Sequence, residues 1–163
     1  MRIKAQQNKN IKRNDEQLSS LGVKIRQTPN VEGLVERKIQ KEDSDINTIT
    51  GKFNYNENVL NYIGIEKGEF LFINIRLNVE YKKDELKTHF INKNKLLEHI
   101  NEQNKKNLGM KIFVTENEDE TLLVSSNIEY ILNSKTNDFS FVENALQILS
   151  IAPMFLNINK TSE

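Results

Sequence analysis

The chain has 163 residues, of which 37% are hydrophobic and 28% are charged, and these proportions exclude a wholly disordered chain. Its 23 basic and 23 acidic residues cancel, so no overall charge draws it to nucleic acid or to an anionic membrane. The absence of cysteine excludes disulfides, thiol nucleophiles and thiolate metal sites.

The N-terminal segment, residues 1–14, is polar and basic, with no acidic residue before Asp15. Its basic residues are Arg2, Lys4, Lys9, Lys12 and Arg13. We expect residues 1–14 to form a flexible basic arm and residues 15–163 to form a single domain. The alternative is an arm that contacts nucleic-acid phosphates, although no aromatic residue is interleaved with the basic ones to stack on bases.

The segment after the arm favours helix. Residues 15–21 have the length of a short helix that Gly22 would close. Farther on, apolar residues have the spacing of one helical face, which indicates a weak second helix or a connecting segment. These residues are Val31, Leu34, Val35 and Ile39.

The middle of the chain predicts strands. Residues 48–55 and 59–66 flank an Asn-rich turn and have the composition of a strand pair. Residues 70–81 give the clearest signal, because apolar side chains occupy the odd positions, while polar ones fill the even positions after Phe72. Alternate side chains of a strand point to opposite faces, so we expect the odd set to face a core and the even set to face water.

The last part of the chain predicts a helix over residues 93–107, a hairpin of residues 110–116 and 121–131, and an amphipathic helix over residues 139–152 that Pro153 stops. The resulting order is α(α)-β-β-β-α-β-β-α. We therefore expect an α+β fold with an antiparallel sheet of about five strands and helices packed on one face.

Motifs that carry chemistry are missing from the sequence. There is no Gly-x-Ser-x-Gly elbow, no P-loop and no dinucleotide fingerprint. The two histidines, His89 and His99, have no evident set of further metal ligands, and the acidic run at 116–120 has no glycine of the kind that calcium loops need. We predict no catalytic residue, no metal ligand and no cofactor.

The even face of the strand at 70–81 offers the best candidate contact site. Phe70 and Phe72 lie on this otherwise polar face, ahead of Asn74 and Arg76. Aromatic and arginine side chains are enriched where proteins bind one another, so these four residues are the predicted partner-binding set. The other interpretation is that the N-terminal segment or the last helix covers the two aromatic rings.

Residues 70–151 resemble the bacterial YbjN family, which is similar in fold to type III secretion chaperones. The resemblance lies in the alternating strand at 73–79, the polar link, the helix with Leu97 and Ile100, and the hairpin and last helix that follow Leu108 and Gly109. It does not extend to the first 47 residues. The resemblance implies a small α+β protein that binds other proteins, often as a dimer, without catalytic residues or cofactors.

The sequence thus favours a non-enzymatic protein-binding module of chaperone-like, regulatory or immunity type. Its partner would be another protein, with a homodimer possible. A nucleic-acid-associated protein that uses the basic arm is the alternative, and a hydrolase of unknown class is the second alternative. No apolar stretch is long enough to span a membrane and no signal peptide is recognisable, so we expect a cytoplasmic protein.

Overall fold

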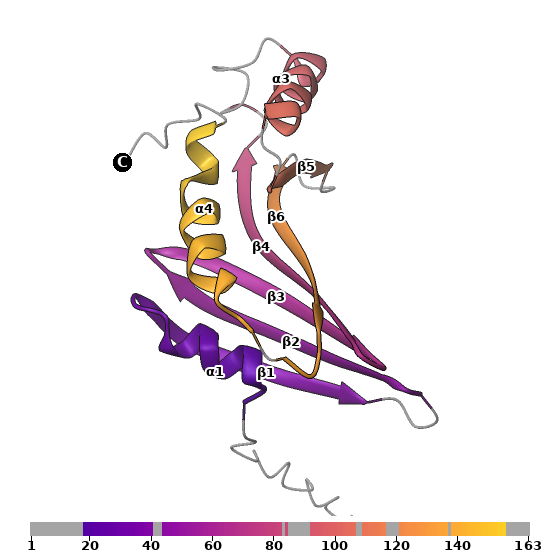
Figure 1. The fold of residues 1–163 in the computed structure, drawn as a ribbon. Coiled ribbons are helices and arrows are strands. Elements are labelled where there is room, and N and C mark those ends of the chain that lie inside the picture. The colour runs from indigo at the N-terminus through magenta and orange to yellow at the C-terminus, as the bar shows by residue number, and fades with distance from the viewer. Residues whose placement is uncertain are drawn as a thin grey trace, which may run out of the picture.

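The computed structural model describes residues 18–40, 44–82, 84, 92–106, 109–116, 121–136 and 138–155. These residues form three helices and six strands (Figure 1). In chain order the elements are α1 (Ser20–Gln27), β1 (Val31–Gln40), β2 (Ile46–Tyr55), β3 (Asn58–Lys67), β4 (Phe70–Lys82), α3 (Lys93–Lys106), β5 (Lys111–Glu116), β6 (Thr121–Asn133) and α4 (Phe141–Phe155).

The strands form one antiparallel sheet in the order β1-β2-β3-β4-β6-β5. The expected α+β class and antiparallel sheet are confirmed, but the sheet has six strands where about five were predicted. It is strongly twisted, because β1 to β3 and the far part of β4 and β6 run in clearly different directions (Figure 1).

The additional strand is β1, whose residues we had assigned to a helix or a link. Its register with β2 shifts between Glu32 and Val35, where Gly33 has a positive φ of 62°. The irregularity interrupts the two-residue alternation, so Val31 and Leu34 contact the core while Val35 is exposed. Apolar positions at 31, 34 and 35 imitate helical spacing for this reason.

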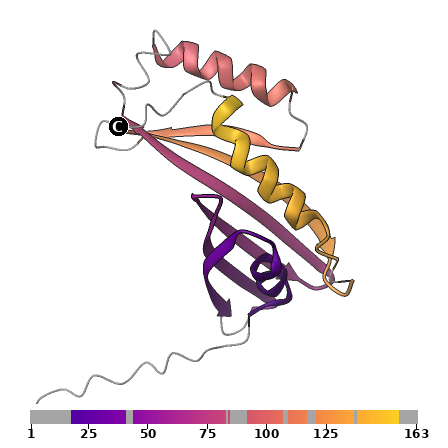
Figure 2. The same cartoon turned by 90° about the vertical axis from the view of Figure 1, so that its left-hand side faces the viewer.

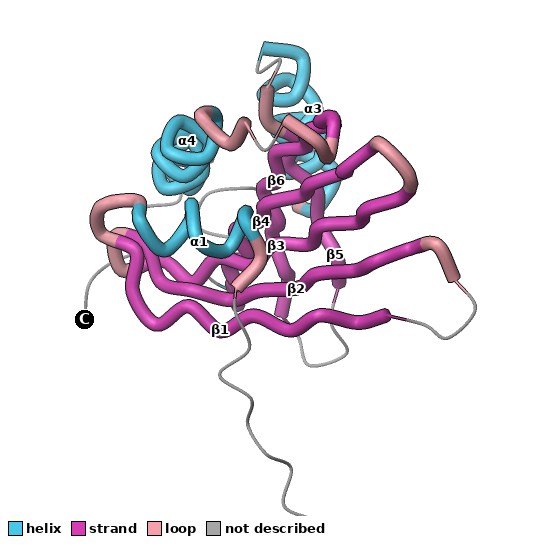
Figure 3. Tube along the Cα trace, turned by 60° about the horizontal axis from the view of Figure 1, so that its bottom comes forward, coloured by secondary structure: helices cyan, strands magenta, loops and turns pink. Residues whose placement is uncertain are grey.

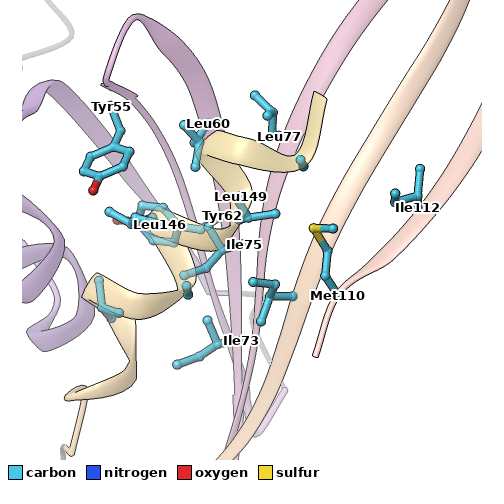
Figure 4. Close-up of a cluster of buried hydrophobic side chains, with 14 of the residues drawn as sticks. Tyr55, Leu60, Tyr62, Ile73, Ile75, Leu77, Met110, Ile112, Leu146 and Leu149 are labelled. Atoms are coloured by element: carbon cyan, nitrogen blue, oxygen red, sulfur yellow. The ribbon is translucent and has the colours of Figure 1, made fainter. Parts of the chain in front are cut away.

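The central strand β4 follows the predicted alternation closely. Its odd residues from Leu71 to Leu77 and Tyr81 are buried, and Figure 4 shows Ile73 and Ile75 among the core side chains. The expectation that the even residues face water is wrong for Asn74, which is only 7% exposed. Its amide donates a hydrogen bond to Glu129 Oε1 at 2.9 Å, on the facing position of β6, and this bond offsets the cost of burying the amide.

All three helices contribute to one hydrophobic core. Leu21 and Ile25 of α1, Leu96 and Ile100 of α3, and the inward stripe of α4 belong to a single cluster with the odd residues of β4. Figure 2 shows α4 lying along β4 and β6, and Figure 3 shows α1 and α4 on the same side of the strands. The helices α1 and α4 thus lie on one face of the sheet, as predicted for the helices, and we call this the inner face.

Two predicted helix ends are wrong. The first helix runs from Ser20 to Gln27, because the Ser19 side chain caps it by accepting a hydrogen bond from Gly22 N at 3.0 Å. Gly22 therefore lies inside this helix and does not end it. The last helix continues past Pro153 to Phe155, since a proline in the final turn removes only one backbone hydrogen bond.

Candidate functional site

The face of the sheet opposite the helices carries the predicted partner-binding set. We call it the outer face. On it, the strand register places five residues from five strands side by side. This apolar row consists of Ile39, Thr48, Ile65, Phe72 and Ile131. Four intervals between neighbouring strands make the row about 19 Å long.

The aliphatic side chains of the outer face are exposed to solvent. Ile131 has 71% of its surface exposed and Ile39 has 50%. On one side of the apolar row lie Val35 and Ile63, and on the other lies Phe70, which is 66% exposed. The helices α1 and α4 pack on the opposite face, and the apolar row with Val35, Ile63 and Phe70 forms an apolar patch that lies outside the core cluster.

Basic side chains accompany the aliphatic ones on β1 to β3. Arg37 lies opposite Thr50, Lys52 lies opposite Asn61, and Lys67 lies opposite Phe70. A shallow depression of about 630 Å³ crosses these strands, and Val35, Ile63, Arg37 and Lys52 are among the residues that line it. Its described lining contains two basic side chains and no acidic one, so the depression has an apolar floor within a positive field.

The predicted set divides into two pairs. Phe70 and Phe72 lie in the apolar patch. Asn74 and Arg76 are engaged within the fold, since Asn74 bonds to Glu129 and the Arg76 guanidinium lies 5.1 Å from the centre of the Phe113 ring. The two aromatic residues thus lie on the surface of the sheet, while the side chains of the two polar ones contact β6 and β5.

Sequence reasoning missed much of the patch. The sequence predicts a weak helix or a connecting segment for Val35 and Ile39, and it places Ile131 only at the end of a hairpin. Ile63 and Ile65 carried a usable signal, because β3 is apolar on both of its faces. A strand that alternates aliphatic residues outward as well as inward indicates a sheet with two apolar faces.

The predicted basic arm lies outside the described residues, so the nucleic-acid alternative stays a prediction. Its basic residues are Arg2, Lys4, Lys9, Lys12 and Arg13. Within the described ranges, no group of three or more His, Asp or Glu side chains is arranged to hold a metal ion.

A hydrogen-bonded network of polar side chains on the inner face is the second candidate site. The Glu36 carboxylate accepts hydrogen bonds from the Tyr62 hydroxyl and from Ser19, both from its backbone N–H at 2.6 Å and from its hydroxyl at 2.7 Å. Burial, together with the adjacent Glu36 carboxylate, raises the pKa of Tyr62 above its ordinary value. The network thus anchors the start of α1 to β1 and β3.

A cavity of about 340 Å³ lies beside this network, lined in part by Ser19, Lys38, Glu66 and Phe139. Its described lining includes neither Glu36 nor Tyr62, the residue whose pKa is raised most among those that the structure describes. Catalytic sites bring a perturbed group and a cavity together. The hydrolase alternative therefore gains no geometric support from this cavity and stays a prediction.

Comparison of the chain with protein-family models, curated proteins and solved structures finds no match. The resemblance to the YbjN family consequently stays a prediction. In the part of the chain that the structure describes, no helix has both the length and the apolar character needed to cross a membrane.

Proposed function

We propose that this chain is a non-enzymatic protein-binding module that contacts its partner through the outer face of the sheet. The observation that supports this proposal is the apolar row with its exposed neighbours. Side chains such as Ile131 and Phe70 are 71% and 66% exposed and contribute little to the stability of the isolated fold. Contiguous apolar patches on a monomer typically mark sites of interaction.

The form of the patch favours a protein over other ligands. Small molecules bind in concave sites that enclose most of their surface, whereas the depression that the described residues form on the outer face is shallow. Nucleic acid would bind the basic residues through its phosphates but would leave the apolar row exposed to water. A protein surface can cover both at once. The YbjN-like resemblance of residues 70–151 implies the same class of function, and we place this function in the cytoplasm.

A matched pair of double variants tests the proposal. Ile39→Lys with Ile131→Lys places two charges in the apolar row. Ile148→Lys with Ile151→Lys makes the same change on the solvent side of α4, where these residues are 39% and 46% exposed. Each bait is used to capture proteins from the native host, and captured proteins are identified by mass spectrometry, purified and titrated against all baits.

We expect a purified partner that binds the wild type and the α4 variant equally and binds the outer-face variant at least about tenfold more weakly. Loss of binding in the α4 variant alone would move the site to the helix. A partner that binds all three baits equally would overturn the proposal, as would the absence of any partner that binds directly.

A further inference from the structure

Resting on the proposed function, we infer that the element which docks on the outer face is an amphipathic, acidic α-helix of a partner protein. The first argument concerns backbone hydrogen bonds. Strands β2, β3, β4 and β6 are paired on both sides, so a partner on this face cannot join them as a further strand. An extended peptide lying on Ile63 and Ile65 would leave its own N–H and C=O groups against apolar surface, whereas a helix bonds those groups internally.

The dimensions of the patch fit one helix. It extends about 19 Å across the strands, and about 20 Å along β3 from Val59 to Ile65. A helix rises 1.5 Å per residue, so either dimension accommodates about 13 residues. The inner face of the same sheet already accepts such an element, because α4 covers it with the 15 residues Phe141–Phe155.

The area argues against a second copy of the chain as the occupant. A patch of this size covers on the order of 400 Å², about half of the roughly 800 Å² that each partner contributes to a stable interface of standard size. A peptide-like element needs less area than a second copy of the chain.

The charged residues of the outer face indicate that the partner helix is acidic. On the outer face, β1 to β3 present Arg37, Lys52 and Lys67 and one acidic residue, Glu32, near one end, whereas the acidic Glu129 lies beside Ile131 at the β6 end of the patch, where it accepts a hydrogen bond from Asn74. Acidic residues that flank the apolar stripe of a partner helix would pair with these cations as the aliphatic side chains are covered. The chain's own residues 1–14 contain five basic and no acidic residues, so they lack the complementary charge.

A displayed library of random 16-residue peptides, selected on the full-length protein, tests the inference. Enriched peptides are synthesised and titrated by fluorescence anisotropy against the wild type, against Arg37→Glu, Lys52→Glu, Lys67→Glu combined, and against Ile39→Lys, Ile131→Lys. We expect enriched peptides with apolar residues at helical spacing and net negative charge. Their affinity should fall at least about tenfold in the charge-reversed variant, and exchanging their Glu for Lys should restore binding to that variant.

The remaining outcomes are distinct from one another. Basic, proline-rich or non-periodic peptides that still require Ile39 and Ile131 would overturn the acidic helix and leave the proposed function standing. Peptides that bind the Ile39→Lys, Ile131→Lys variant as tightly as the wild type would remove the proposed function as well. A lack of binders, with a dimer in light scattering that the same variant abolishes, would assign the face to a second copy and overturn the inference.

Discussion

Tyr62 lies across the backbone of Gly51, which faces it in the β2–β3 pairing: a Cβ at Gly51 would lie 2.0 Å from Tyr62 Cε1. The glycine therefore provides the space that lets the tyrosine ring lie flat on the sheet and extend its hydroxyl toward Glu36 on β1. Because Gly51 has no side chain, Tyr62 of β3 packs on β2 and reaches Glu36 of β1, and the same carboxylate binds Ser19 at the start of α1.

Gly51→Ala should destabilise the protein strongly, because the new methyl group and the ring cannot both stay in place. We expect a loss of about 1–3 kcal/mol or more in the free energy of unfolding, as for other overpacked cores. Urea denaturation measures it. Gly109→Ala is the control, since a Cβ there meets nothing within 4 Å. An unchanged midpoint for Gly51→Ala would show that Tyr62 moves away without cost.

The hydrogen bond from Tyr62 to Glu36 should contribute strongly to stability. Tyr62 is 1% exposed and its acceptor is a carboxylate, so Tyr62→Phe should cost about 1.5–3 kcal/mol. A double-mutant cycle with Glu36→Ala, which removes the acceptor, separates this bond from the other contacts of each residue. We expect a coupling energy of at least about 1 kcal/mol, and independent effects of the two substitutions would contradict it.

The same tyrosine predicts a dependence of stability on alkaline pH. Burial and the Glu36 carboxylate raise the pKa of Tyr62 in the folded protein above the ordinary value of 10.0. A raised folded-state pKa means that the stabilisation is complete below pH 10 and is lost as the pH rises from there toward the folded-state value. The stability difference between wild type and Tyr62→Phe should thus be constant from pH 7 to 9 and shrink above pH 10, measured by urea unfolding at each pH. A difference that is flat up to pH 11 would contradict the assignment.

How far the sequence predicts this fold depends on how local each signal is. The alternation in β4 and the helical spacing of α3 and α4 are local, and the structure has a strand and two helices at these places, although Asn74 is buried and α4 continues past Pro153. The irregularity at Gly33 is also local, but it breaks the period on which the prediction of β1 depended. The apolar row is the extreme case, because Ile39, Ile65 and Ile131 become neighbours only through the registers of four strand pairs, which no short window of sequence contains.

Asn104 should be essential to the edge of the sheet at β5. Its side chain accepts a hydrogen bond from Ile112 N and donates one to Ile112 O, both at 2.7 Å, so it occupies the place of a further strand. Asn104→Ala leaves both groups without this partner and should cost about 1–3 kcal/mol. Hydrogen exchange of the Ile112 amide should accelerate accordingly. Lys106→Ala, an exposed change in the same helix, is the control and should leave that amide protected.

The outer face should contribute little to folding, and a matched pair of substitutions tests this directly. Ile131 is 71% exposed, whereas Ile73 on β4 is fully buried. Threonine keeps the β-branched shape of isoleucine, so Ile131→Thr should change the free energy of unfolding by less than about 0.5 kcal/mol. Ile73→Thr removes buried apolar surface and buries a hydroxyl, and should cost more than about 2 kcal/mol.

Denaturant unfolding at two protein concentrations completes this test. If Ile131→Thr costs as much as Ile73→Thr, and the wild-type midpoint rises with protein concentration, then the outer face is covered by a second copy in the native protein. A small effect of Ile131→Thr, with a midpoint that does not depend on protein concentration, would show that the apolar row is in contact with water in the native protein. Such a result is expected for a partner-binding surface. Its exposed side chains do not stabilise the isolated fold, so burying Ile39, Ile65 and Ile131 against a partner would contribute to binding.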